Sequence, residues 1–212
     1  MIEHKTVSLA EQVFEHLENN ILSGVYARGE YLTELKLVAD LGVSRTPIRE
    51  ALHRLETEHI IETTSKGILV LGVTEKDIED IYEIRLKIEG LAARKAAENI
   101  TDEHLKEMEE TVELQEFYVE KKDAEQIRKM DSKFHYQLYL YSGSNVYLDT
   151  LEPLHKKLQK YRKTSVENSE RAKLSVLEHK AIYDAIASRD GKAAEEAAFY
   201  HVVQGKNHIF KN

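Results

Sequence analysis

Four side chains in the second half of the sequence are of types that bind divalent metal ions. Asp131 and His135 are four residues apart in a helical segment, so both point to one face of that helix. His179 and His201 lie in the middle of two further helical segments. One carboxylate and three imidazoles on inward-facing helices can hold a divalent ion in the core of a bundle. The alternative is a hydrogen-bonded histidine cluster, which the spacing alone favours because polar i, i+4 pairs arise freely on helices.

The chemistry of these ligands limits which ion they would select. Imidazole suits Zn, Ni, Cu and Fe, and a carboxylate extends the choice towards Mn. The sequence contains no cysteine, which excludes thiolate ligands, thiolate catalysis and disulfides. We expect a divalent transition metal as cofactor, with Zn or Ni favoured and Mn or Fe as alternatives.

Two Glu-x-x-His pairs have the spacing of the di-iron ligands in ferritin-like bundles. Glu56 and His59 form one pair, and Glu152 and His155, on either side of Pro153, form the other. Because the two pairs fall in different predicted domains, we attribute both to chance.

A second group of residues, in the first quarter of the chain, has types and spacing suited to reading nucleic acid. Arg45 and Arg49 are four residues apart in a segment that follows a tight turn at 42–44. An arginine can donate two hydrogen bonds to guanine in the major groove. Ser44 and Thr46 can donate to phosphates at the same helix N-terminus. The alternative is that both arginines are ordinary solvated charges on an exposed helix. The two preceding helices and the following hairpin favour a role in reading DNA bases.

Arg85 interrupts an otherwise apolar helical face. A buried guanidinium needs an anion to compensate its charge. Glu89, four residues further on, offers a salt bridge as one explanation. The other explanation is a bound carboxylate ligand, whose planar group matches the guanidinium fork.

Two domains are needed to position these groups. Glycine and β-type residues concentrate in the first 72 residues, whereas the remainder has long helical periods broken by short polar stretches. We therefore divide the chain into residues 1–72 and 73–212 and expect a mainly α protein. The first domain should be a winged helix-turn-helix, with helices over 8–22, 31–41 and 44–58 and a small β-hairpin of strands 60–63 and 68–71. The second should be an all-α bundle, with helices over 75–98, 102–121, 124–141, 146–164, 170–188 and 191–210.

Composition and charge further narrow the class of protein. The 212 residues contain no apolar run near the ~20 residues of a membrane span, and the N-terminus lacks the pattern of a signal peptide. We expect a cytoplasmic protein without a membrane partner. The formal net charge is −8, divided equally between the two predicted domains, so charge-driven binding to random DNA should be weak. Specific binding then requires two copies on a two-fold symmetric site.

Residues 8–72 resemble the winged helix-turn-helix of the GntR family of bacterial transcription regulators. The pattern Leu32-x-Glu34-x-x-Leu37-x-x-x-Leu41 and the run from Leu41 to Leu52 carry this resemblance. It implies that Arg45 and Arg49 read bases or clamp phosphates, and that Lys66 and Gly67 at the wing tip enter the minor groove. Where some members carry a further DNA-contacting arginine, this sequence has Leu35.

Residues 75–212 resemble the all-helical FCD effector-binding domain of the FadR-type branch of that family. The matching segments are 82–93, 131–138, 144–148, 178–186 and His201. In the metal-dependent members, one aspartate and three histidines hold the ion. The resemblance assigns that role to Asp131, His135, His179 and His201, and it implies that Arg85 and the metal bind the same small carboxylate effector.

We therefore expect a DNA-binding transcription regulator, a repressor rather than an activator. It should act as a homodimer on a palindromic operator and respond to a small carboxylate. We do not expect an enzyme. The alternative is a metal-dependent hydrolase in which the ion activates water, although no further carboxylate or nucleophile is placed by motif to act as its base.

Overall fold

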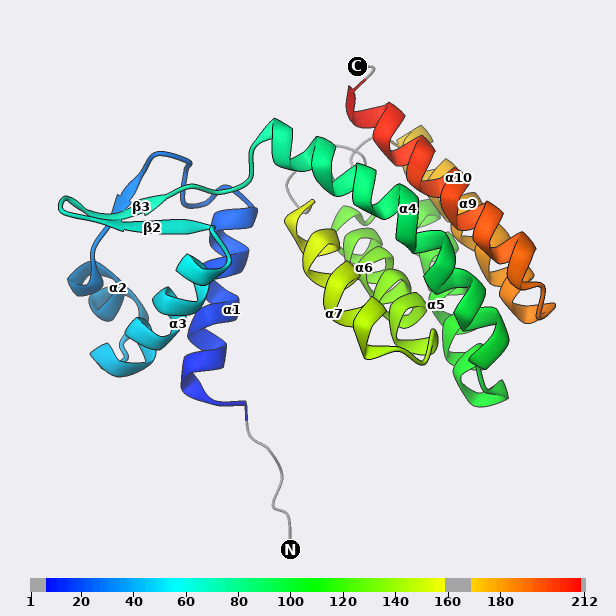
Figure 1. Cartoon of the computed structure of the whole chain (residues 1–212), viewed down its shortest axis with the longest axis horizontal. Coiled ribbons are helices and arrows are strands. Elements are labelled where there is room, and N and C mark those ends of the chain that lie inside the picture. Colours follow the sequence, from blue (N-terminus) through cyan, green and yellow to red (C-terminus); the bar gives the residue numbers. More distant parts are fainter. Residues whose placement is uncertain (1–6, 159–168, 211–212) are drawn as a thin grey trace, which may run out of the picture. The chain divides into compact units, whose positions relative to one another are not determined.

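The computed structural model describes residues 7–158 and 169–210, which divide into two compact units, residues 1–74 and 75–212 (Figure 1). The mainly helical fold that the sequence predicts is confirmed. The helices are α1 (Leu9–Leu22), α2 (Glu34–Leu41), α3 (Arg45–Thr57), α4 (Glu75–Asn99), α5 (Asp102–Lys121), α6 (Ala124–Tyr141), α7 (Asn145–Lys157), α9 (Ser169–Ala187) and α10 (Gly191–Phe210). The strands are β1 (Tyr31–Leu32), β2 (Ile61–Thr64) and β3 (Gly67–Val70).

The helices of the first unit begin and end at residues suited to those positions. Ser8 and Thr33 each cap the first turn of a helix, accepting a backbone hydrogen bond at 3.1 and 3.2 Å. α2 ends at Gly42, whose φ of +65° is the left-handed conformation that glycine adopts without strain. Pro47 lies in the first turn of α3, where its missing N–H costs no helical hydrogen bond.

An apolar core holds the first unit together. α1 packs against α3, and the sheet covers the remaining apolar side chains. The largest side chains that are almost fully buried in this core are Leu17, Leu32, Leu37, Ile48, Leu55, Ile60 and Ile61. The core fixes the position of α3, so its exposed N-terminal residues are presented from a rigid support.

The sheet differs from the predicted hairpin. Tyr31 and Leu32, which the sequence places at the start of a helix, form β1, which pairs antiparallel with β3 and gives the strand order β1-β3-β2. The helix predicted over 31–41 is therefore three residues too long, because Thr33 has an extended backbone and caps α2. A two-residue strand has no periodicity of its own, and its pairing with β3 determines its conformation.

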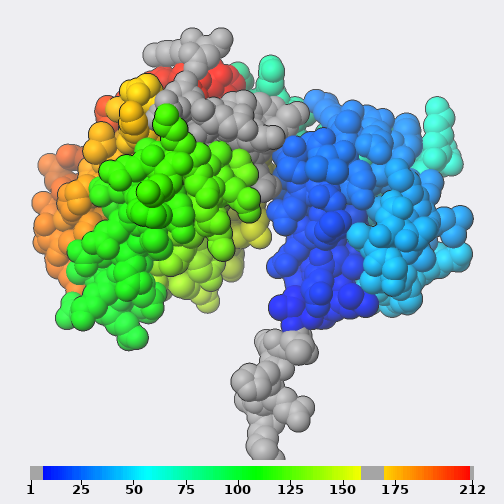
Figure 2. All heavy atoms as spheres, turned by 180° about the vertical axis from the view of Figure 1, so that it is seen from behind, coloured from blue at the N-terminus to red at the C-terminus, as the bar shows by residue number. Residues whose placement is uncertain are grey.

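The second unit is a bundle in which α10 packs on α4 and α9, α5 packs on α6 and α9, and α4 packs on α6. Small side chains on α4 allow close approach of its neighbours: Ala92, Ala93, Ala96 and Ala97 are all fully buried. The outer face of α5, coloured green in Figure 2, carries exposed glutamates at 109, 110, 113, 116 and 120. This is the solvated acidic face expected of such a run.

The helix predicted over 146–164 corresponds to α7, which runs over Asn145–Lys157. Residues 159–164 of that prediction lie outside the described residues. α7 contains Pro153 and brings His155 into its last turn. None of the described helices has the length and apolarity needed to cross a membrane.

Candidate functional site

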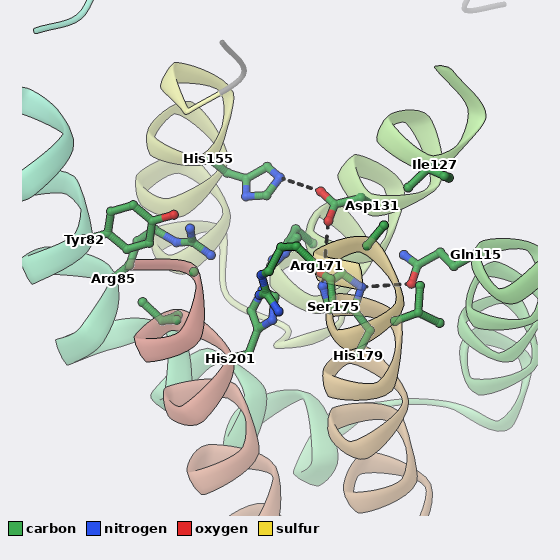
Figure 3. Close-up of a pocket in the computed structure, with 15 residues that line it drawn as sticks. Tyr82, Arg85, Gln115, Ile127, Asp131, His155, Arg171, Ser175, His179 and His201 are labelled. Carbon is green, nitrogen blue, oxygen red and sulfur yellow. Dashed lines mark hydrogen bonds and ion pairs between the residues drawn. The ribbon is translucent and has the colours of Figure 1, made fainter. Parts of the chain in front are cut away.

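The four predicted metal ligands converge on one cavity of the second unit. Asp131 and His135 come from α6, His179 from α9 and His201 from α10. The three imidazoles are 1–6% exposed, and the Asp131 side chain is 13% exposed. Ligand atoms of His135, His179 and His201 lie within 4.8 Å of one another. Residues from three helices, spread over 71 positions of the sequence, thus meet at one point (Figure 3).

Hydrogen bonds orient two of these imidazoles. Nδ1 of His179 is 2.9 Å from Oε1 of Gln115, whose amide nitrogen donates to a backbone carbonyl at 3.0 Å and so fixes the amide orientation. Nδ1 of His201 is 2.7 Å from a carboxylate oxygen of Glu178. Both acceptors are oxygens without a proton, so Nδ1 is the donor and Nε2 carries the lone pair. Partners of this kind set the tautomer that a metal-binding histidine requires.

Asp131 lies between two imidazoles. Its Oδ1 is 3.9 Å from Nε2 of His179, and its Oδ2 is 3.7 Å from Nε2 of His155. Both separations are too long for hydrogen bonds. Two atoms that are each about 2.1 Å from one ion are at most about 4.2 Å apart, so both pairs can share an ion. The donor set and its spacing therefore fit a divalent transition metal.

Burial keeps part of this cluster neutral. Removal from water, followed by the neighbouring His201 and Arg85, lowers the pKa of His135 well below its ordinary value. Burial, together with His135 and Arg85, has the same effect on the pKa of His155. Neutral imidazole is the metal-binding form. These two histidines therefore carry available lone pairs at neutral pH.

Arg85 lines the same cavity, and its charge is compensated from within the chain. Its Nε and Nη2 donate to the two carboxylate oxygens of Glu89 at 2.5 and 2.8 Å, and both side chains are buried. Burial opposes ionisation of Glu89, but the guanidinium prevails and lowers the pKa of that carboxyl. The salt bridge to Glu89 is thus formed, and a bound carboxylate would share Arg85 with it.

His155 and Arg171 are among the cavity residues that are not predicted from the sequence. His155 belongs to a Glu-x-x-His pair attributed to chance; Glu152 instead pairs with Lys156 at 3.1 Å, whereas the His155 ring centre is 4.1 Å from that of His135. Arg171 also lines the cavity and donates two hydrogen bonds to Glu178, at 2.6 and 2.8 Å. The sequence signal that could have placed His155 in the cavity is its position in the last turn of an amphipathic helix.

The cavity is small. Its volume is about 60 Å³, enough for a few water molecules or a small carboxylate. Tyr82 and Arg85 lie at one side of it and Gln115 at the other (Figure 3). The chemistry available is therefore binding of an ion together with a small polar molecule.

The predicted nucleic-acid contacts lie at the start of α3, in the first unit. Ser44, Arg45 and Thr46 are exposed, and the Ser44 side chain makes no capping hydrogen bond, unlike Ser8 and Thr33. Its hydroxyl remains available to a phosphate. The Arg49 side chain is 62% exposed, and its Nε donates to both carboxylate oxygens of Glu34 at 2.9 and 3.1 Å. That contact fixes one end of the guanidinium on the exposed face of the helix.

The wing tip is a two-residue turn between β2 and β3. Lys66 is exposed there, and Gly67 has φ of +130°. A Cβ on Gly67 would lie 2.9 Å from the carbonyl oxygen of Leu32, so the approach of β1 excludes any side chain. On α2, Leu35 is 65% exposed and presents an apolar surface.

Known proteins resemble this chain in both of its units. Residues 9–70 match the family described as bacterial regulatory proteins, gntR family, and residues 80–204 match the FCD domain. The chain is 33% identical over 177 residues to the Nta operon transcriptional regulator of Aminobacter aminovorans, covering 81% of this chain and 79% of that protein. It is 29% identical over 201 residues to the HTH-type transcriptional regulator YdhC of Bacillus subtilis, covering 93% and 89%.

A solved structure shows the same fold. McbR/YncC of Escherichia coli superposes with a TM-score of 0.83 at 24% identity, covering 97% of this chain and 99% of that one. These relatives are regulators, which removes support from the hydrolase alternative. The chain belongs to the GntR family of bacterial transcription regulators, with an FCD domain in its second unit, and is not an enzyme.

Proposed function

We propose that this regulator is a metal-dependent repressor whose affinity for its operator is set by a small carboxylate bound in the second unit. One observation carries the proposal: Asp131, His135, His179 and His201 line one small buried cavity, and ligand atoms of the three histidines lie within 4.8 Å of one another. Zn and Ni suit this donor set, and Mn and Fe are the alternatives.

The effector would bind beside the ion. When bound, the metal supplies a positive charge and an open coordination position for one oxygen of a carboxylate. Arg85 lines the same cavity and presents a guanidinium that Glu89 holds in place. The cavity volume of about 60 Å³ limits the effector to a small molecule. A small carboxylate therefore satisfies both the charge and the size of the site.

Operator binding would rest on two copies of the first unit. Ser44, Arg45, Thr46 and Arg49 supply the contacts of α3 in the major groove, and Lys66 and Gly67 those of the wing in the minor groove. The acidic net charge of −8 supports specific rather than charge-driven binding. A homodimer on a palindromic site doubles the few contacts that each copy offers.

Repression relieved by the effector requires the ligand to bind one state of the dimer better than another. The relatives include an RspR of Escherichia coli described as a transcriptional repressor, at 27% identity over 198 residues, which supports the same sign here. The effector would bind more tightly to the state of the dimer whose two α3 helices do not fit the two half-sites of the operator. Its binding would therefore lower the affinity for the operator.

Fluorescence anisotropy tests the proposal with a labelled duplex from the upstream region of the protein's own gene. Metal-loaded protein should bind this duplex at least about tenfold more tightly than a shuffled duplex, and a panel of small carboxylates should contain one that weakens binding. His179→Gln should abolish the carboxylate response, whereas the exposed His16→Gln on α1 should preserve it. Equal affinity for both duplexes would refute the operator proposal. A carboxylate response that persists in His179→Gln would refute the metal site as its origin.

A further inference from the structure

His155 occupies a place in the cavity that the predicted ligand set leaves unexplained. It lies in the last turn of α7, is 5% exposed, and points towards Asp131 (Figure 3). Ligand atoms of Asp131, His135 and His155 lie within 4.8 Å of one another, as those of His135, His179 and His201 do. The two groups share His135, so they form one continuous cluster.

Neither ring nitrogen of His155 has a hydrogen-bond partner among the described residues. Nδ1 of His179 and Nδ1 of His201, by contrast, are both engaged by side-chain oxygens. Leaving a buried polar group unsatisfied is costly, and native proteins rarely do it without a functional reason. Coordination of an ion satisfies an imidazole nitrogen in such a place.

The distances around His155 match those between ligands of one ion. Nε2 of His155 is 3.7 Å from Oδ2 of Asp131, below the limit of about 4.2 Å for two atoms bound to one metal. The ring centres of His135 and His155 are 4.1 Å apart. Two imidazoles bound to one ion at roughly right angles have ring centres about 4.5 Å apart, given a metal–nitrogen bond of about 2.1 Å.

His135 limits the cluster to one ion. Its Nδ1 is 3.3 Å from a carboxylate oxygen of Glu89 and 3.4 Å from the hydroxyl of Tyr139. This leaves Nε2 for coordination, and one nitrogen binds one ion. Because both groups of ligands depend on His135, they converge on the same metal.

We propose that His155 is a fifth protein ligand of this ion, beside Asp131, His135, His179 and His201. The inference rests on the proposed metal site and makes it more specific. Five protein ligands leave one position open on a six-coordinate ion, which favours Ni, Mn or Fe over Zn, whose structural sites hold four ligands. The open position would accept a single oxygen of the carboxylate effector.

Metal titration of the full chain, stripped with chelator, tests this assignment. His155→Gln should weaken the binding of Ni²⁺ and Mn²⁺ by more than the about tenfold to 100-fold that loss of an outer-shell partner costs, with a smaller loss for Zn²⁺. His53→Gln, which removes an exposed histidine from the first unit, should bind as the unmodified chain does. Unchanged Ni²⁺ and Mn²⁺ affinity in His155→Gln would overturn the inference.

A second measurement uses the unmodified chain and so does not depend on how the variant folds. X-ray absorption of the Ni²⁺-loaded protein should show four imidazoles, and the Co²⁺-loaded protein should have the weak visible absorption of a five- or six-coordinate ion. Three imidazoles, or the intense absorption of tetrahedral Co²⁺, would overturn the role of His155 while leaving the proposed function intact. Failure of the unmodified chain to bind any of these ions would overturn both.

Discussion

The Arg85–Glu89 pair contributes to the fold and to the candidate site at once. Both side chains are buried, and their charges compensate each other through two hydrogen bonds. α4 carries a second pair with the same spacing, Arg94 and Glu98, whose side chains are 53% and 39% exposed. The two pairs share one helix and one spacing but differ in solvent access, and Glu98 also pairs with Lys95 at 2.6 Å.

Glu89→Gln should lower the free energy of unfolding by about 3–5 kcal/mol, because it leaves the Arg85 charge buried without its partner. Glu98→Gln should lower it by less than about 1 kcal/mol, since water screens the exposed pair. Urea denaturation of both variants measures the difference. Similar losses in the two variants would show that Arg85 finds another anion in the cavity.

Most of the candidate site is predictable from the sequence at the level of residue types. Asp131, His135, His179 and His201 come together, although their spacing alone favours a packed cluster and the family resemblance makes the difference. His155 escapes prediction because its neighbours in the sequence, Glu152 and Pro153, suggest a different motif. Its proximity to His135 depends on how α7 packs against α6, which no local pattern encodes.

At the scale of elements, α3 is the helix that we propose to read the operator sequence. Arg45→Ala and Arg49→Ala should each weaken binding to the operator duplex by about 1–3 kcal/mol, since each removes hydrogen bonds to bases or phosphates. Lys180→Ala, an exposed cation on α9, is the matched control and should leave binding unchanged. Anisotropy titrations at fixed salt measure all three. If Lys180→Ala lost as much affinity for the operator duplex as the α3 variants do, direct contact of α3 with the DNA would be refuted.

The wing depends on a backbone that admits only glycine at its tip. Gly67→Ala should destabilise the protein more than Gly42→Ala, which should cost about 1–2 kcal/mol for its left-handed backbone alone. A Cβ added at Gly42 meets open space, whereas one added at Gly67 would lie 2.9 Å from the Leu32 carbonyl oxygen. Thermal denaturation of the two variants shows which substitution destabilises the protein more. A smaller loss for Gly67→Ala would mean that β1 moves aside without cost.

The elements themselves are largely predictable, because long apolar periods and capping residues are local signals. The predicted ranges agree within one residue at each end for α1, α3, α4, α5, α6, α9 and α10. The exception is β1, since the two residues Tyr31 and Leu32 become a strand only through pairing with Leu69 and Ile68 of β3. Such a segment is defined by its tertiary partner rather than by its own sequence.

At the scale of the whole molecule, the buried histidines make stability depend on pH. Burial lowers the pKa of His135 and of His155 below their ordinary value, so the folded protein holds both rings neutral where the unfolded chain protonates them. Below about pH 6.5 the free energy of unfolding should therefore fall by about 1.4 kcal/mol per pH unit for each ring. Above that pH these two rings add no pH dependence.

Urea denaturation between about pH 7.5 and 5.0, on either side of the ordinary histidine pKa and with chelator present throughout, measures this dependence. Because His155→Gln removes one of the two titrating rings, it should reduce the slope of the free energy of unfolding against pH by the contribution of that ring. A free energy of unfolding that stays constant over this range in the unmodified chain would contradict the neutral, buried state of both histidines.

At the scale of the whole molecule, the proposed function depends on a metal ion between α6, α9 and α10. The melting temperature of the full chain, with a divalent metal and with chelator, tests it most directly. An ion at about 100 times its dissociation constant should stabilise the folded state by about 2.7 kcal/mol, which raises the melting temperature of the unmodified chain by several degrees and that of His179→Gln by clearly less. Equal melting temperatures of the unmodified chain with metal and with chelator would contradict the presence of this site.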